Sequence, residues 1–385
     1  MGPGGWAFDP AGREGLAALT SAVGPSAAGA RDRVALAREL DRRGGSMQRH
    51  CDPESNEVTT SGPASELEPL LRVLSDVVLR PRFAPEDLER VRRQLFERQL
   101  RESTQPGHRA DRELLRSVFP VGHPYRRSGL GSHRSLSRLQ RADVVRFHRD
   151  RTTSAAAFLV VTSSRSLAEV VRLARQTFPE FPSERPDPAA PSARGVRGRA
   201  TRRNLPMADR SQTEIRVGGS APPRTDPAYP ALALANEVLG GRSLLNRLFQ
   251  HIRETRGLAY HASSELEAMR WGGYWTAQAG TGPERVERVL ELVAKEIRTV
   301  AEELIPVSEL TRIRESAIGE IPLALETAAD AHDLAVDGAY HGLSERHWRE
   351  WPQVLRSISS REIREATSGV YDPARTVTVV AGSVS

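Results

Sequence analysis

Cysteine, long apolar runs and aromatic residues are scarce in this 385-residue chain, and each scarcity removes a class of protein. The single cysteine, Cys51, excludes an internal disulfide framework and a thiolate zinc cluster. No stretch approaches the roughly 18 consecutive apolar residues of a membrane-spanning helix. The opening residues 1–14 lack the basic and apolar regions of a signal peptide. We therefore expect a soluble, cytoplasmic protein.

Lysine is equally rare, since Lys295 is the only one. Arginine therefore carries the positive charge behind a net charge of +6 and a pI of about 10.0. A basic chain can bind nucleic acid, but these arginines alternate with glutamate along stretches such as 88–102. That pattern is typical of solvated helix faces, not of a basic groove with interleaved aromatic residues. We expect neither a nucleic-acid partner nor a membrane partner.

The length favours two domains, and the order of elements repeats once along the chain. Four elements of the first half have counterparts at nearly constant spacing in the second half: a helix end at Gly45 and Gly257, an amphipathic helix at 67–71 and 286–290, the segments 88–92 and 310–314, and a strand at 159–161 and 379–381. Two unrelated α/β sequences can also align loosely, but the shared order favours a tandem duplication. We predict a first domain over 1–182, a linker rich in proline, glycine, alanine and arginine over 183–200, and a second domain over 201–385.

Both halves combine long amphipathic helices with strand-like pieces. The segment 258–280 is the clearest hairpin, with a Gly-Gly pair between two strand-like runs. The apolar segment 155–163 predicts one more short, buried strand. The predicted fold class is α+β, with an antiparallel sheet in each domain and helices packed on one face of it.

The most informative stretch is 246–260, with the sequence NRLFQHIRETRGLAY. Its apolar residues follow helical spacing, and Gly257 can take the left-handed conformation that ends a helix. Arg253 then lies on the last turn and Tyr260 just after the helix end, so both side chains can point at one spot. The residues alone leave a structural interpretation open, in which the arginine caps helix carbonyls and the tyrosine packs in the sheet.

This stretch, followed by a hairpin and an amphipathic helix, resembles the second domain of the insulinase-like (pitrilysin) family of zinc peptidases, which includes mitochondrial processing peptidase. The first half resembles that family's first domain through GWAFDPAGREGLAAL, FAPEDLERVRRQL, HPYRRSGLGSHRSL and FLVVTS, which occur in family order. The resemblance covers essentially the whole chain. Family members usually have opening strands before the helix that contains Ala18, and few residues precede it here. The first domain is therefore expected either to begin upstream or to lack those strands, which would leave an edge for a partner to cover.

The resemblance also implies a zinc site that this chain has lost. Active members carry H-x-x-E-H, whose histidines bind zinc from one helix face and whose glutamate activates water. The matching residues here are Ala18, Ser21 and Ala22. The family's third ligand, a glutamate, falls on Arg98, which is a permanent cation. The neighbouring Glu97 points about 100° away along a helix. We expect this chain to bind no metal and to be inactive alone.

The resemblance leaves one functional pair in place. In the family, an arginine and a tyrosine at this separation bind the substrate backbone and stabilise the oxyanion opposite the zinc, and they match Arg253 and Tyr260. This predicts a non-catalytic, substrate-binding subunit of a heterodimeric zinc endopeptidase that processes peptides. A homologous subunit with H-x-x-E-H would supply the zinc. Two other functions stay open: a scaffolding subunit, like the core subunits of the cytochrome bc1 complex, and a nucleic-acid adaptor with steeply salt-dependent binding.

Overall fold

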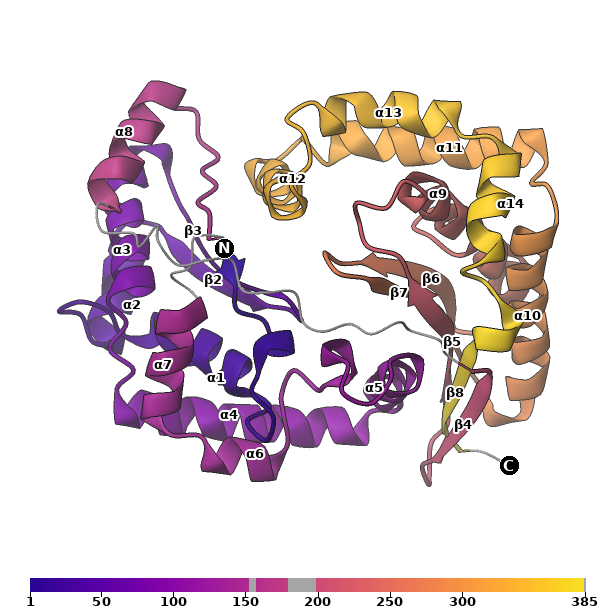
Figure 1. Ribbon diagram of the computed structural model, residues 1–385, viewed down its shortest axis with the longest axis horizontal. Coiled ribbons are helices and arrows are strands. Elements are labelled where there is room, and N and C mark those ends of the chain that lie inside the picture. Colours follow the sequence, from indigo (N-terminus) through magenta and orange to yellow (C-terminus); the bar gives the residue numbers. More distant parts are fainter. Residues whose placement is uncertain (152–156, 179–198, 384–385) are drawn as a thin grey trace. The chain divides into compact units, whose positions relative to one another are not determined.

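The computed structural model describes residues 1–151, 157–178 and 199–383 (Figure 1). Both α-helices and β-sheets are present, so the predicted α+β class is confirmed. The contacts divide the chain into two compact units. Unit 1 comprises Met1–Arg101 and Arg127–Ser192, and unit 2 comprises Glu102–Arg126 and Ala193–Ser385. Most of the predicted linker 183–200 lies outside the described residues.

Unit 1 combines a small antiparallel sheet with seven helices among its described residues. The strands are β1 (Gly2–Pro3), β2 (Ser46–Cys51) and β3 (Ser55–Ser61), in the order β1-β3-β2, and the helices are α1 (Leu16–Val23), α2 (Arg33–Arg42), α3 (Leu67–Leu79), α4 (Pro85–Thr104), α6 (His133–Arg138), α7 (Arg141–Arg151) and α8 (Leu167–Thr177). Its largest apolar cluster joins α1 to α4, α6 and α7. The amphipathic stripes of these helices therefore meet in one core.

The strand predicted over 155–163 does not form in the part that the structure describes. Residues 157–163 have no regular strand, although Phe158 exchanges two backbone hydrogen bonds with Met1, at 2.9 and 3.0 Å. A ladder needs several paired residues in succession, and one pair does not make a strand. The remaining residues of this prediction lie outside the description.

Unit 2 is built on a five-stranded sheet. Its strands are β4 (Thr201–Pro206), β5 (Thr213–Ala221), β6 (His261–Ala268), β7 (Gly273–Thr281) and β8 (Val377–Gly382), in the order β4-β8-β5-β7-β6. The hairpin predicted over 258–280 is confirmed as β6 and β7. The sheet is not wholly antiparallel, because β4 and β8 run parallel. These two strands are far apart in sequence, so no tight turn forces them to run in opposite directions.

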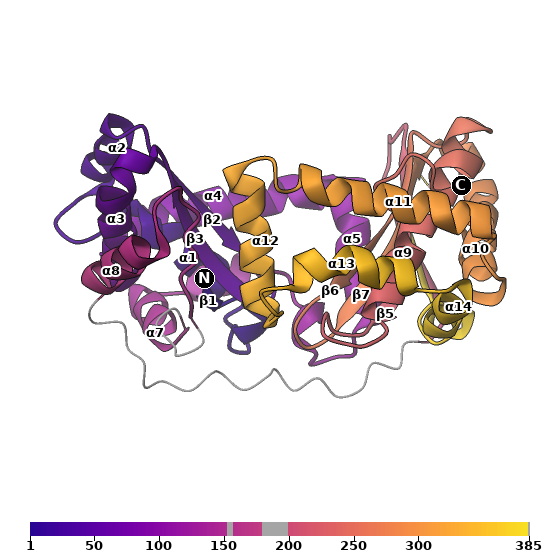
Figure 2. The same ribbon diagram turned by 90° about the horizontal axis from the view of Figure 1, so that it is seen from above.

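Helices cover both faces of this sheet to different extents. The helices of unit 2 are α5 (Pro106–Val118), α9 (Tyr229–Leu239), α10 (Val286–Glu302), α11 (Val307–Leu323), α12 (Ala328–His341), α13 (His347–Ser357) and α14 (Ser360–Ser368). Those from α9 onward gather on one side and α5 lies on the other (Figure 1), while α11 and α13 run side by side (Figure 2). The fully buried Trp275 lies in the large core on the α9 and α10 side. None of the described helices is long and apolar enough to cross a bilayer.

Segment 102–126 lies in unit 2, although the sequence interpretation assigns it to a first domain of 1–182. Its helix α5 buries Ala110, Leu114 and Val118 and contacts β5 and β8. A Cβ atom at Gly218 would lie 2.3 Å from the carbonyl oxygen of Trp275 on β7 and 3.3 Å from Leu114, so this glycine allows the close approach first of β7 and then of α5.

The two units repeat one order of elements. In unit 1 the hairpin β2–β3 precedes α3 and α4, and in unit 2 the hairpin β6–β7 precedes α10 and α11. This shared order supports the predicted duplication. The described sheet has three strands in unit 1 and five in unit 2, so the units agree in element order more closely than in sheet size.

His148 on α7 is held in its neutral form. Its Nε2 atom lies 2.9 Å from the carbonyl oxygen of Val78, and its ring packs edge-on against Phe83 with centroids 5.2 Å apart. Burial lowers the pKa of His148 to about 4, against an opposing effect of the bond to Val78. The folded protein therefore binds a proton at this site only at low pH.

Acidification from pH 7.5 to pH 5 should destabilise the protein through this histidine. An unfolded histidine titrates near pH 6.5, so between about pH 6.5 and 4 the unfolded chain binds a proton that the folded chain does not. The stabilising contribution is full above pH 6.5 and is lost as the pH falls, by up to roughly 2–3 kcal/mol. Urea unfolding of wild type and His148→Gln at both pH values measures it.

The glutamine keeps an N–H donor but does not titrate, so His148→Gln should lose less stability on acidification than wild type. His341, whose pKa burial also lowers to about 4, is present in both proteins, and the difference between them isolates His148. Equal losses in the two proteins would contradict the neutral assignment.

Candidate functional site

The helix predicted within the stretch 246–260 forms over 247–254, and most of it is a π-helix (Phe249–Glu254). The wider spacing is visible in the bond from the Thr255 N–H to the carbonyl of Gln250, five residues earlier, at 3.0 Å. Single π-turns are rare and often occur at functional sites.

Gly257 ends this helix as predicted. Its φ is +58°, in the left-handed region. The Gly257 N–H donates to the carbonyl of Arg253 at 2.9 Å, and the Leu258 N–H donates to the carbonyl of Ile252 at 3.0 Å. The first of these bonds is the one that defines an αL cap, and together they fix the path of the chain from the helix into the sheet.

Apolar packing and side-chain hydrogen bonds hold the π-helix in place on unit 2. Leu248 and Ile252 are completely buried in the large core of unit 2. The Asn246 side chain, itself buried, accepts a hydrogen bond from the Phe249 N–H at 2.7 Å and donates to the carbonyl of Gly241 at 2.9 Å. The start of the helix is therefore capped by a side chain that is fixed in turn.

Arg253 and Tyr260 both lie on the surface of unit 2. The Arg253 guanidinium lies over the Phe249 ring, 5.2 Å from its centroid, and the side chain is exposed. Tyr260 immediately precedes β6, where its N–H donates to the carbonyl of Gly280 at 2.8 Å, and the residue is 66% exposed. The turn therefore holds the backbone of both residues and leaves both side chains toward solvent.

Other arginines bond the carbonyls of this turn. Arg256 donates to the carbonyl of His251 at 2.5 Å, and Arg285 donates to the carbonyl of Gly257 at 3.1 Å. The Arg253 side chain is thus directed along Phe249, and two neighbours take the capping role that the structural interpretation assigned to it.

The four positions of the degenerate zinc site lie on two helices of unit 1. Ala18, Ser21 and Ala22 lie on α1, where the last two are buried, and Arg98 is exposed on α4. Burial lowers the pKa of Arg49, and the charges of Arg90 and Arg98 lower it further, so the surroundings of Arg98 are cationic.

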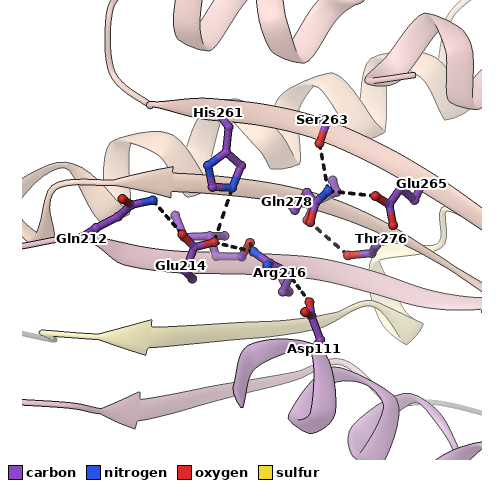
Figure 3. Close-up of polar contacts among 11 residues, drawn as sticks. Asp111, Gln212, Glu214, Arg216, His261, Ser263, Glu265, Thr276 and Gln278 are labelled. Carbon is purple, nitrogen blue, oxygen red and sulfur yellow. Dashed lines mark hydrogen bonds and ion pairs between the residues drawn. The ribbon is translucent and has the colours of Figure 1, made fainter. Parts of the chain in front are cut away.

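The face of the unit 2 sheet on which α5 lies carries a polar network that the sequence did not predict (Figure 3). We call it the sheet-face network, and its members are Asp111, Gln212, Glu214, Arg216, His261, Ser263, Glu265, Thr276 and Gln278. At its centre, Arg216 donates to Asp111 on α5 at 2.6 Å and to Glu214 at 2.9 Å. The Glu214 carboxylate also accepts from Gln212 at 2.7 Å and lies 3.4 Å from Nε2 of His261.

The electrostatics of this network centre on Glu214. Burial alone would raise the pKa of Glu214, but hydrogen bonds from His261 and Arg216 hold it below its ordinary value. The Glu214 carboxylate is therefore a buried anion that accepts several hydrogen bonds, and a buried anion needs such bonds to offset the loss of water. Because His261 adjoins Tyr260, the network also fixes the start of β6.

Part of this network had a signal in the sequence. In β5, charged residues at 214 and 216 alternate with Ile215 and Val217, so polar side chains lie on one face of an otherwise buried strand. Asp111 had no such signal, because it comes from a helix that the sequence placed in the other half of the chain.

A cavity of about 640 Å³ opens along the free edge of β6. Residues of α9, α11 and α13 form its other walls, including Tyr229, Trp348 and Trp351. β6 is an edge strand, and the Ser264 N–H is closed by the carbonyl of Gly240 at 2.6 Å. The volume of the cavity is within the usual range of ligand sites.

Comparison with known proteins shows which proteins this chain resembles. Residues 138–317 match the family model described as peptidase M16 inactive domain. An uncharacterized zinc protease of Mycobacterium tuberculosis is 29% identical over 300 residues, which are 78% of this chain and 68% of that protein. One from Streptomyces coelicolor is 27% identical over 371 residues, which are 91% and 78%.

Solved structures have the same fold. A peptidase M16 inactive domain from Pseudomonas fluorescens superimposes with a TM-score of 0.91 at 21% identity, over 100% of this chain and 92% of that one. A protease from Helicobacter pylori gives 0.89 at 16% identity, over 98% and 91%. The comparisons confirm the resemblance to the insulinase-like (M16) peptidase family.

The M16 relatives are described as zinc proteases, but the matching positions of this chain do not fit a zinc ion. Two alanine methyl groups and a buried serine hydroxyl replace the family's ligands and base, and Arg98 brings a positive charge. Among the residues that the structure describes, no three His, Cys, Asp or Glu side chains are grouped to hold a metal.

Replacing Gly257 by alanine should destabilise unit 2 by about 1–2 kcal/mol. No atom lies within 4 Å of the position that the added Cβ would occupy, so the loss would come from the left-handed backbone alone. Urea unfolding measures it. Gly369→Ala is the matched control, because this glycine also has open space around it but a φ of −93°. If both variants are equally stable, the left-handed conformation at Gly257 does not favour glycine.

Proposed function

We propose that this chain is the non-catalytic, substrate-binding subunit of a heterodimeric zinc endopeptidase that processes peptides. The partner would be a homologous subunit with an H-x-x-E-H motif, which supplies the zinc and the general base. This chain would supply Arg253 and Tyr260 to the partner's active site. A cytoplasmic location belongs to the same proposal.

The exposed Arg253–Tyr260 pair on a fixed turn carries the proposal. A structural arginine would bond helix carbonyls and a structural tyrosine would be packed. Here Arg256 and Arg285 bond the carbonyls, and Tyr260 is 66% exposed. Two large donor side chains are kept toward solvent by an αL cap, in a chain whose own zinc-site positions hold no ligands, and this favours a role in trans.

The chemistry of the pair suits peptide hydrolysis. A guanidinium and a phenol both donate hydrogen bonds, and donors placed where negative charge develops on a carbonyl oxygen lower the barrier to its attack. Arginine stays charged at any relevant pH, and its planar group can hold an oxygen from two N–H donors. Neither residue needs to exchange a proton, so the partner would perform the acid–base steps.

The part of the β6 edge that follows Ser264 would offer the substrate a place to bind. Extended peptides commonly add to an exposed strand edge, where backbone groups supply hydrogen bonds and neighbouring pockets accept side chains. β6 begins next to Tyr260 and lines the 640 Å³ cavity. This arrangement supports peptide binding beside the Arg253–Tyr260 pair.

Arg253→Ala or Tyr260→Phe should lower the peptidase rate of the reconstituted pair by about one to three orders of magnitude, on the scale of losing an oxyanion donor. The assay mixes this chain with the H-x-x-E-H relative from the same genome and measures cleavage of an unstructured peptide library. Arg298→Ala, which removes an exposed arginine from α10, is the matched control and should leave the rate unchanged.

If the mixture is active and neither substitution changes its peptidase rate, the scaffolding alternative is favoured, in which this chain is a structural subunit. Binding to nucleic acid that weakens steeply with salt would instead favour the adaptor alternative.

This chain alone should bind no stoichiometric zinc and should cleave no peptide, because its ligand positions hold alanine, serine and arginine. Metal analysis after dialysis against zinc, for each subunit and for the mixture, checks this expectation. About one zinc per pair should appear, and it should travel with the partner subunit. Stoichiometric zinc in this chain alone would mean that its ligands lie elsewhere.

A further inference from the structure

The orientation of the Arg253 side chain depends on the backbone conformation of the π-helix that carries it. Its guanidinium lies over Phe249, one turn earlier on the same helix, and the side chain is otherwise exposed. Each residue of an α-helix advances by about 100°, so one additional residue in a turn redirects every later side chain by a comparable angle. The direction of Arg253 relative to Tyr260 therefore depends on the π-helix being kept.

One ion pair and one histidine–glutamate hydrogen bond hold this π-helix on unit 2. Arg247, just before it, meets Glu309 on α11 through two parallel bonds of 2.8 and 2.9 Å. His251, two residues before Arg253, places its Nδ1 atom 2.8 Å from Glu296 on α10. The Arg247–Glu309 contact holds the start of the π-turn, and the His251–Glu296 contact holds its centre.

Glu296 occupies a costly position for a carboxylate. It is 5% exposed and lies on the face of α10 that also buries Val293 and Ile297. A charged group buried on an apolar helix face destabilises the fold unless it is paired. Its contact with His251 supplies that pairing and ties the rigid helix α10 to the π-turn.

We propose that His251 and Glu296 are positioning residues that keep the π-turn and so aim Arg253 at the substrate. This inference rests on the proposed function of Arg253. Neither residue touches the substrate, and both act through the backbone of the turn. Losing the pair lets the turn relax toward ordinary α-helical spacing and rotates Arg253 away.

A double-mutant cycle with Arg253 tests this inference. Peptide cleavage by the reconstituted pair is measured for Glu296→Ala and Glu296→Gln, each with Arg253 and with Arg253→Ala. With Arg253 present, Glu296→Ala should lower kcat about 10- to 100-fold, the scale of a misplaced catalytic group. Glu296→Gln, whose amide oxygen can still accept a bond, should stay within about threefold of wild type. With Arg253→Ala, Glu296→Ala should change the rate less than about twofold.

The controls separate positioning from general damage. Glu287→Ala removes an exposed carboxylate from the same helix and should leave kcat unchanged. Thermal unfolding shows that each variant is folded at the assay temperature. If Glu296→Ala does not fold, His251→Ala and His251→Gln complete the same cycle, since this side chain is 47% exposed.

An equal loss on Glu296→Ala in both Arg253 backgrounds would overturn the positioning role and leave the proposed function intact. No loss on Arg253→Ala itself would overturn the proposed function, and the positioning role with it.

Discussion

The burial of one face of the five-stranded sheet in unit 2 is the constraint on which the candidate site depends. Trp275 and the apolar residues of β5 and β7 pack against α9, α10 and α14 on that face. Leu248 and Ile252 insert into the same core from the π-turn, so the hydrophobic effect fixes the turn to the sheet. Arg253 and Tyr260 inherit their positions from this packing.

Polar groups then decide details that apolar packing leaves open. Apolar contacts have no direction, so they hold a helix against a sheet without selecting the hydrogen-bond spacing of one turn. Glu296 with His251, and Arg247 with Glu309, supply direction at the π-turn. On the opposite face of the sheet, Arg216 joins α5 to β5 in the same manner. Each buried charge has a partner, so the cost of burial is offset where the geometry matters.

Much of the architecture could be predicted from sequence, because it follows from periodicity. The hairpin β6–β7, the helices α3, α4, α10 and α11, and the left-handed Gly257 all had local signals in spacing or residue type. The family resemblance was also carried by local motifs, and the comparisons confirm it.

What escaped prediction depends on contacts between distant segments. The π-turn differs from an α-turn by one residue of spacing, which an apolar stripe does not specify. The apolar stripe of α5 is the same whichever sheet it covers, so the sequence could not place it on β5 and β8. The parallel pairing of β4 with β8 and the contact of Asp111 with Arg216 also join segments that are far apart in sequence, so local patterns do not specify them. The placement of Arg253 over Phe249 likewise depends on the turn beneath it.

The place of β8 in the sheet has a consequence for how the chain is made. β8 contains residues 377–382, yet it lies between β4 and β5 inside the sheet, and α5 packs on it from far upstream. The ribosome therefore releases β4, β5, β6 and β7 well before the strand that joins β4 to the others exists. During that interval β5 exposes an unpaired edge, which is open to association with other nascent chains. Unit 2 can complete its sheet only after translation of β8, and α5 gains its contacts with β8 only then.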